Sequence, residues 1–214
     1  MTRPTPADPA RTEILARIRE ALTDPVPPAD VPRDYRRSTA REVDVVARFA
    51  ERVADYRATV IRTSPAALAA TIGATLRDRR IRRLVVPAGI PPAWLGDIRG
   101  ELLRDEPPLS RLDLDAADGV LTSCAIAIAE TGTIVLDGGA GQGRRALSLL
   151  PDYHCCVVLS EQIVGDVPEA IAGLDPRRPM TWISGPSATS DIELQRVEGV
   201  HGPRTLDVVL VSPG

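Results

Sequence analysis

The chain has 214 residues, and its 29 acidic residues outnumber its 26 basic residues, so the net charge at pH 7 is −3. Aromatic residues make up only 3% of a negatively charged chain, which excludes the basic, stacking surface of a typical nucleic-acid-binding protein. All 26 basic residues are arginine, and without lysine the chain cannot perform Schiff-base chemistry or form a Walker-type phosphate loop.

The length suits one sizeable domain with an N-terminal extension. The three cysteines, Cys124, Cys155 and Cys156, lack the Cys-x-x-Cys spacing of iron–sulfur proteins and are too few for a disulfide framework. The first residues are polar, and no run of 18 apolar residues occurs. We therefore expect a cytoplasmic protein that neither spans nor binds a membrane.

The N-terminal region predicts a short amphipathic helix. Asp8 and Pro9 are typical of an N-cap followed by a first helical residue. An apolar stripe at helical spacing comes next, formed by Ile14, Leu15, Ile18 and Leu22. Prolines then interrupt residues 24–38. These features divide the chain into an N-terminal helix and proline-rich connector over 1–36 and a main domain over 37–214.

The main domain alternates helical and strand-like segments. Thr39 and Glu42 have capping-box spacing and predict a helix whose inward stripe is Val43, Val46, Ala50 and Val53. A strand at 58–63, a helix that begins at 64–65 and a strand at 82–89 follow. Later strands are predicted at 118–123, 125–132, 133–138, 154–160, 181–187 and 206–211, with helices at 144–150 and 167–172. This order predicts a parallel sheet covered by helices.

Residues 138–145, with the sequence GGAGQGRR, form a glycine-rich loop before a predicted helix. Backbone N–H groups and a helix N-terminus at such a loop can bind an anion, which makes Gly141, Gly143, Arg144 and Arg145 candidate ligand-binding residues. The glycine spacing does not fit the dinucleotide-binding fingerprint. The alternative is a connector without a ligand.

Glu130, in the sequence AETGT, lies between two apolar strands, where a carboxylate is seldom buried without a partner. It is therefore a candidate catalytic base or nucleophile, with Thr131, Gly132 and Thr133 as ligand-binding neighbours. Alternatively, Glu130 ends a strand and the two threonine hydroxyls cap it.

Residues 183–196 carry hydroxyl groups and an acidic residue where a strand ends, and open α/β sheets bind ligands at such positions. The candidate residues here are Ser184, Gly185, Ser187, Thr189 and Asp191. Ser190 and Glu193 have capping-box spacing, so helix initiation alone is the alternative. His201, in the sequence GVHGP with a glycine and a proline after it, is a further candidate. We predict no metal site, since Cys155 and Cys156 would point to opposite faces of a strand.

Three sequence blocks between about residues 120 and 211 resemble the LUD domain family, in its short lactate utilisation protein C branch. The blocks read AIAETGTIVL, GRRALSLLPDYHCCVVLSEQIV and WISGPSATSDIELQRVEGVHGPRTLDVVLV. The resemblance implies a three-layer α/β/α fold with a mostly parallel central sheet, like that of sugar-phosphate isomerases and CoA transferases. The sequence departs from the family pattern at Ala188, where a basic residue is expected. If that basic residue normally binds the anion, Arg144 or Arg145 would have to bind it here.

The same resemblance implies a component of an iron–sulfur system that oxidises L-lactate to pyruvate. A small anionic ligand would bind at the ETGT and SGPS loops, with Glu130 as the base or orienting acceptor. We expect no cofactor in this chain, iron–sulfur clusters on partner subunits, and no self-contained redox centre. Two alternatives stay open: a non-catalytic assembly or regulatory subunit, and an enzyme that acts alone on a phosphorylated or CoA-linked molecule. Homo-oligomer formation also stays open.

Overall fold

The computed structural model describes residues 9–22, 32–34, 38, 44–186 and 202–213. The chain divides into two units, Met1–Tyr35 and Arg36–Gly214, and each is described by itself. In the described part of the chain, no helix combines the length and apolar character that crossing a membrane would require.

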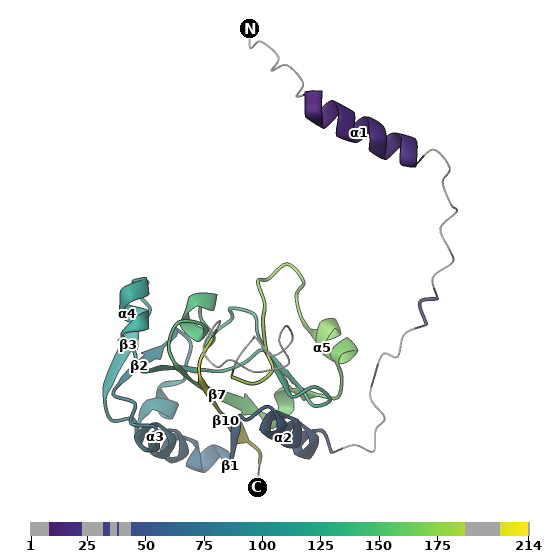
Figure 1. Ribbon diagram of the computed structural model, residues 1–214. Coiled ribbons are helices and arrows are strands. Elements are labelled where there is room, and N and C mark those ends of the chain that lie inside the picture. The colour runs from purple at the N-terminus through teal and green to yellow at the C-terminus, as the bar shows by residue number, and fades with distance from the viewer. Residues whose placement is uncertain (1–8, 23–31, 35–37, 39–43, 187–201, 214) are drawn as a thin grey trace. The chain divides into compact units, whose positions relative to one another are not determined.

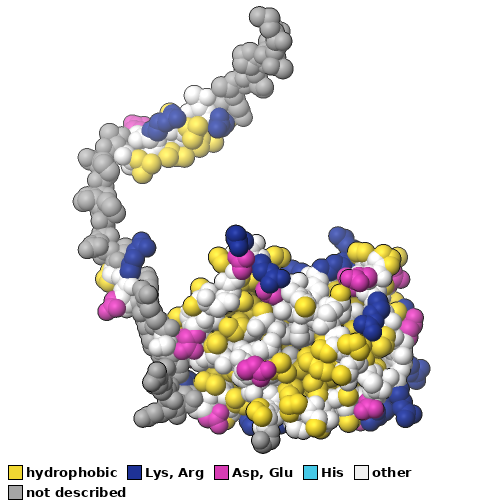
Figure 2. Space-filling model, turned by 180° about the vertical axis from the view of Figure 1, so that it is seen from behind, with side chains coloured by type: hydrophobic (Ala, Val, Ile, Leu, Met, Phe, Trp, Pro, Cys, Tyr) yellow, Lys and Arg dark blue, Asp and Glu magenta, His cyan; other side chains and the backbone are white. Residues whose placement is uncertain are grey.

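The described part of the smaller unit contains helix α1 (Pro9–Ala21). Within this unit its apolar stripe is uncovered: Ile14 is 58%, Ile18 49% and Leu22, just beyond the helix, 68% accessible to solvent. Figure 2 shows apolar side chains along one side of this helix and arginine side chains on another. The stripe is therefore as predicted, whereas the predicted N-cap Asp8 lies outside the described residues.

The larger unit is built on a six-stranded sheet in the order β1-β10-β7-β4-β2-β3, in which all five neighbouring pairs are parallel (Figure 1). Its strands are β1 (Thr59–Thr63), β2 (Arg83–Val86), β3 (Glu101–Arg104), β4 (Gly119–Thr122), β7 (Tyr153–Leu159) and β10 (Thr205–Val211). The central strands are runs of apolar residues because both faces of the sheet are covered.

A second, four-stranded sheet has the order β8-β5-β6-β9. Its strands are β5 (Ile126–Ile128), β6 (Thr133–Leu136), β8 (Ile163–Val164) and β9 (Thr181–Ile183). Strands β5 and β6 form an antiparallel hairpin, and β9 pairs antiparallel with the other edge of β6. The sequence predicted three of these strands but not that they form a separate sheet.

Helices cover the two faces of the central sheet. Helix α3 (Leu68–Asp78), which follows the 3-10 turn η1 (Pro65–Ala67), packs Leu68, Ile72 and Leu76 against one face, beside the turn η2 (Pro92–Leu95). Helix α2 (Val45–Asp55) packs with the second sheet against the other face. The remaining helices and turns are α4 (Arg111–Asp115), η3 (Arg145–Ser148), η4 (Ser160–Gln162) and α5 (Val167–Gly173). The three-layer α/β/α fold is thus confirmed.

Helix α2 begins later than its predicted capping box. Its N-cap is Asp44, whose carboxylate accepts hydrogen bonds from the N–H groups of Val46 and Ala47 at 3.1 and 3.0 Å. Thr39 and Glu42 lie outside the described residues. An aspartate with two such bonds satisfies helix N–H groups that would otherwise lack partners, so the described helix starts here.

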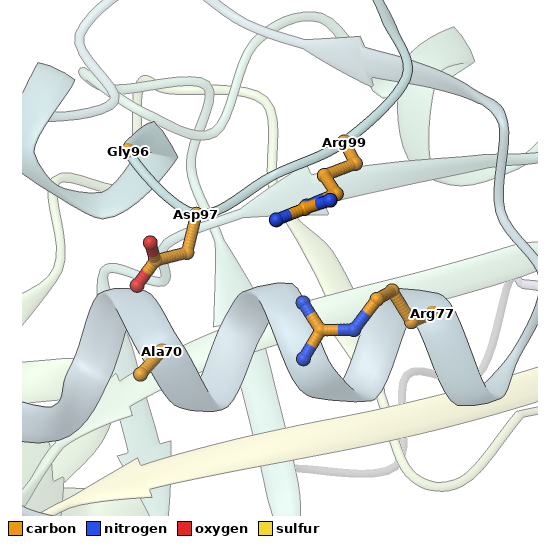
Figure 3. Close-up of a pocket in the computed structure, with 5 residues that line it drawn as sticks. All are labelled: Ala70, Arg77, Gly96, Asp97 and Arg99. Atoms are coloured by element: carbon orange, nitrogen blue, oxygen red, sulfur yellow. The ribbon is translucent and has the colours of Figure 1, made fainter.

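Close to the end of α3, a cavity of about 330 Å³ lies between the helix and the segment that leads to β3 (Figure 3). It is on the face of the central sheet opposite to α2 and the second sheet.

Candidate functional site

The turn between β5 and β6 carries the AETGT sequence and is fixed on two sides. The N–H groups of Ala129 and Glu130 donate to the carbonyl oxygens of Val164 and Gly165, at 2.9 and 3.0 Å. On the other side Gly132, with φ of 60°, packs on the backbone of α2. A Cβ atom on Gly132 would lie only 2.7 Å from the carbonyl carbon of Arg52, so this position requires glycine.

Three hydroxyl groups meet beside this turn. The Oγ1 atoms of Thr131 and Thr133 are 2.7 Å apart, and Thr133 Oγ1 lies 2.8 Å from Ser184 Oγ, at the end of β9. We call Thr131, Thr133 and Ser184 the hydroxyl cluster. Thr133 is buried and the other two residues are half-buried. Two hydrogen bonds use two of the three hydroxyl protons, so one hydroxyl of the cluster keeps a proton for another acceptor.

Arg52, on α2, is a basic residue whose backbone contacts this turn at Gly132. Its Nε is buried and has no hydrogen-bond partner among the described residues, while its Nη1 lies a long 3.4 Å from Asp55 Oδ2. A buried guanidinium N–H without an acceptor is costly, and a bound anion would satisfy it. The sequence does not single out Arg52, because its contact with Gly132 is made only in the folded chain.

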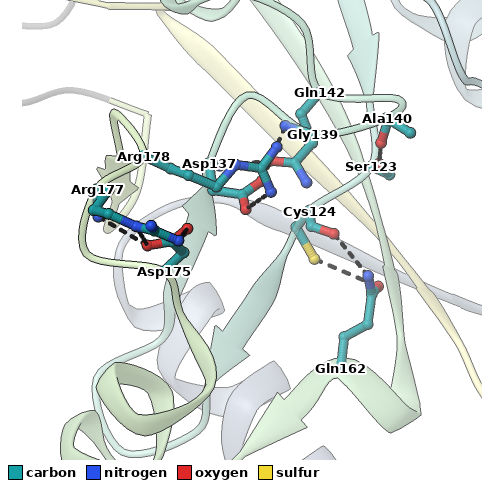
Figure 4. A network of polar contacts seen from close by, with 10 residues as sticks. All are labelled: Ser123, Cys124, Asp137, Gly139, Ala140, Gln142, Gln162, Asp175, Arg177 and Arg178. Atoms are coloured by element: carbon teal, nitrogen blue, oxygen red, sulfur yellow. Dashed lines mark hydrogen bonds and ion pairs between the residues drawn. The ribbon is translucent and has the colours of Figure 1, made fainter.

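The glycine loop lies at the opposite end of β6 and is held by its own polar groups (Figure 4). Gln142 Oε1 accepts the N–H of Asp137 at 2.6 Å, and Asp137 Oδ1 accepts the N–H of Gly139 at 3.0 Å. Arg178 Nη1 donates to Asp137 Oδ2 at 2.5 Å. Asp137 and Gln142 are buried, so these side chains form the framework of the loop.

The same loop is fastened to the ends of two central strands. The N–H of Ser123, after β4, donates to the carbonyl of Gly141 at 2.8 Å, and the N–H of Gly141 donates to the carbonyl of Ala88, after β2, at 2.7 Å. Gly141 has φ of 74°, and a Cβ atom there would lie 2.6 Å from Ser123 Oγ. Glycine is therefore needed for close packing at this position.

The helix predicted at 144–150 is only a 3-10 turn of four residues, η3 (Arg145–Ser148), so a helix N-terminus is not available to bind an anion. Arg144 is already paired: its Nε and Nη2 lie 2.8 and 3.0 Å from the oxygens of Asp105, and Nη2 also donates to the carbonyl of Leu109. Burial opposes ionisation of Asp105, but the hydrogen bonds from Arg144 and the Leu109 N–H hold its pKa below the ordinary value. Arg145 is exposed.

The three cysteines are free and buried. Cys155 packs on the α3 side of the central sheet and Cys156 on the α2 side, as the strand geometry predicted. Burial raises the pKa of the Cys155 thiol, and a hydrogen bond with Cys156 together with burial raises that of Cys124. The thiols of Cys124 and Cys155 are thus neutral groups of the core. Gln162, which donates to the Cys124 carbonyl at 2.7 Å and accepts the Leu159 N–H, ties β7 to the segment before β5 (Figure 4).

The predicted site residues therefore fall into two groups. Thr131, Gly132, Thr133 and Ser184 come together, with Glu130 on the same turn and Gly185 after Ser184. The other group, Gly141, Gly143, Arg144 and Arg145, lies beyond the far end of β6. The candidates Ser187, Thr189, Asp191 and His201, and also Ala188, lie outside the described residues.

Comparisons with known proteins give a consistent result. Residues 99–211 match the LUD domain family. A protein of Deinococcus radiodurans named Lactate utilization protein C is 49% identical over 211 residues, which are 95% of this chain and 96% of that protein. A protein of the same name from Shouchella clausii is 36% identical over 105 residues, 46% of this chain and 45% of that protein. The crystal structure of a DUF162 family protein from Deinococcus radiodurans, 48% identical, superposes with a TM-score of 0.66 and covers 78% of this chain and 96% of that one.

Proposed function

The chain belongs to the LUD domain family, and from this premise we propose that it acts in lactate utilisation, as a subunit of an iron–sulfur system that oxidises L-lactate to pyruvate. The names of its relatives support the link to lactate. The burial of all three cysteines supports a division of labour in which partner subunits carry the clusters and accept the electrons.

The hydroxyl cluster, on the turn whose Gly132 packs against Arg52 of α2, is the observation that carries a ligand site for this function. Lactate has a carboxylate and a neighbouring hydroxyl group. Arg52, whose Nη1 pairs with Asp55 but whose buried Nε has no acceptor among the described residues, would bind the carboxylate, and the hydroxyl cluster would hydrogen-bond the hydroxyl oxygen. Glu130, on the same turn, would accept the hydroxyl proton, while the two electrons of the lactate C2–H bond would pass to the partner subunits and its proton to solvent.

Complementation of a deletion strain tests this site by growth on lactate. Thr133→Val removes the middle hydroxyl of the cluster with little change in shape, Arg52→Gln removes the cation, and Glu130→Gln removes the base. All three variants should grow much more slowly than the wild type. Full growth of both Thr133→Val and Arg52→Gln would show that the site is wrong.

Matched controls separate loss of the site from loss of folding. Thr75→Val removes another buried threonine hydroxyl, one that bonds to the Thr71 carbonyl within α3. Arg48→Gln changes an arginine on α2, one turn before Arg52. Both controls should restore growth, and all variants should be compared for soluble protein level.

An assembly role is the second candidate, and the exposed stripe of α1 favours it. Apolar helix stripes of this kind commonly dock into a groove of a partner. Introducing Ile14→Glu and Ile18→Glu together in the full chain should then abolish co-purification with the partner subunits. Loss of co-purification with full activity of the hydroxyl-cluster variants would favour assembly over ligand binding.

A further inference from the structure

The cavity beside α3 is lined by residues from two separate segments (Figure 3). The helix contributes Ala70 and, from its last turn, Arg77, while the segment before β3 contributes Gly96, Asp97 and Arg99. The hydroxyl cluster packs on the other side of the central sheet, so this cavity is a different location.

Close packing fixes the walls of the cavity. A Cβ atom on Gly73 of α3 would lie 2.5 Å from the carbonyl oxygen of Asp97, so helix and segment are in direct backbone contact. The segment is held further by hydrogen bonds from Ile98 N–H to the Leu95 carbonyl and from Glu101 N–H to the Arg82 carbonyl, at 3.2 and 2.7 Å. The backbone positions of Arg77 and Arg99 are therefore held at a constant separation.

The guanidinium groups of Arg77 and Arg99 both extend into the cavity (Figure 3). Within the described part of the chain, neither forms an ion pair or a hydrogen bond, and Asp97 forms none with them. Nearby arginines differ, because Arg79 is bonded twice to the buried Asp207 and Arg83 is bonded to Glu101. Two cations facing one cavity repel each other, and an oxyanion between them would replace repulsion by two charge-assisted hydrogen bonds.

We propose that this cavity binds the phosphate group of a small phosphomonoester. Arg77 and Arg99 would hold the phosphate oxygens, and guanidinium groups suit this role because their N–H groups are planar and paired. The volume of about 330 Å³ exceeds that of a phosphate and leaves room for a short carbon skeleton. Asp97, on the wall, would accept a hydrogen bond from a hydroxyl group of that skeleton.

Isothermal titration calorimetry of the full chain with two probes, inorganic phosphate and glycerol 3-phosphate, tests the proposal. The wild type should bind both, and glycerol 3-phosphate more tightly. Arg77→Gln and Arg99→Gln should each weaken both probes by at least about tenfold, the effect of losing one charged hydrogen bond. Asp97→Ala should strengthen inorganic phosphate, because a repelling charge is removed, and should reduce the preference for glycerol 3-phosphate, because its hydroxyl group loses an acceptor.

Arg62→Gln is the matched control, since Arg62 is an exposed arginine on β1 outside the cavity lining. It should leave both affinities unchanged. All the substituted side chains are exposed, so the thermal midpoint should also stay constant. The proposal is overturned if the wild type binds neither probe at about 10 mM, a very weak affinity. It is equally overturned if Arg62→Gln weakens binding as much as the cavity variants do.

Discussion

The two ends of strand β6 look alike in sequence, since each combines glycine with polar residues, but they differ in how the polar groups are used. At the glycine loop, Asp137 and Gln142 are buried, and their hydrogen bonds hold the backbone of the loop. At the AETGT turn the hydroxyls bond to one another and one proton is left over. Glycine at both ends reflects close backbone contact, whereas only unsatisfied polar groups indicate a ligand.

The largest expected effect tests the close contact at the AETGT turn. Gly132→Ala should lower the free energy of unfolding by about 3 kcal/mol, because the new methyl group clashes with the α2 backbone and the residue has positive φ. Gly138→Ala, whose φ is also positive but whose Cβ has its nearest neighbour at 3.7 Å, should cost only about 1 kcal/mol. Urea unfolding measures both, and equal losses would contradict the close contact.

Next in size is the framework of the glycine loop. Gln142→Leu removes the acceptor of a buried N–H group and should cost about 2 kcal/mol of unfolding free energy. At a temperature where the variant stays folded, it should still support growth on lactate. Loss of growth in a folded variant would place the glycine loop in the ligand site and remove the distinction between the two ends of β6.

The pH dependence of the unfolding free energy should be the same in variants at either end of β6, because it depends on His154 in β7. Burial lowers the pKa of His154 from 6.5 to about 4, so the unfolded chain takes up this proton first as the pH falls. The contribution of His154 to the free energy of unfolding should therefore be fully present above pH 6.5. It should decrease by about 1.4 kcal/mol per pH unit as the pH falls to about 4. His154→Gln should flatten this slope in urea unfolding at several pH values, while Gly132→Ala and Gln142→Leu should retain it.

The smallest effect is expected at the ion pair of Arg144. This side chain is 39% exposed, so solvent screens its pairing with Asp105, and Arg144→Gln should cost no more than about 1 kcal/mol. Growth on lactate should be normal because the guanidinium is already occupied. A variant with wild-type thermal stability that failed to grow on lactate would assign Arg144 to the ligand instead.

The sequence predicted most of the core elements because their apolar runs are local and continuous, as in β7 and β10. It did not predict β3 or β8, since β3 has a half-exposed pattern and β8 has only two residues. Nor did it predict the separate second sheet, because strand pairing depends on contacts between distant segments. A run such as residues 133–136 fits either sheet equally well.

The candidate site was predictable to a similar degree. The ETGT and SGPS sequences predicted Thr131, Thr133 and Ser184, which antiparallel pairing of β6 with β9 brings together. The pairing of Arg144 with Asp105 was not predictable, because a free and a paired arginine look the same in sequence. Arg52 was missed for the same reason: only the fold brings α2 against Gly132.

The three hydroxyls of the cluster also have a property that a fixed donor would lack. Each O–H group can rotate, so the row of hydrogen bonds can reverse its direction and present either a lone pair or a proton at its end. An alcohol such as lactate can donate to the first arrangement, and a ketone such as pyruvate can only accept from the second. In the proposed site, a change in the direction of these hydrogen bonds would let one set of side chains accommodate the molecule before and after its oxidation.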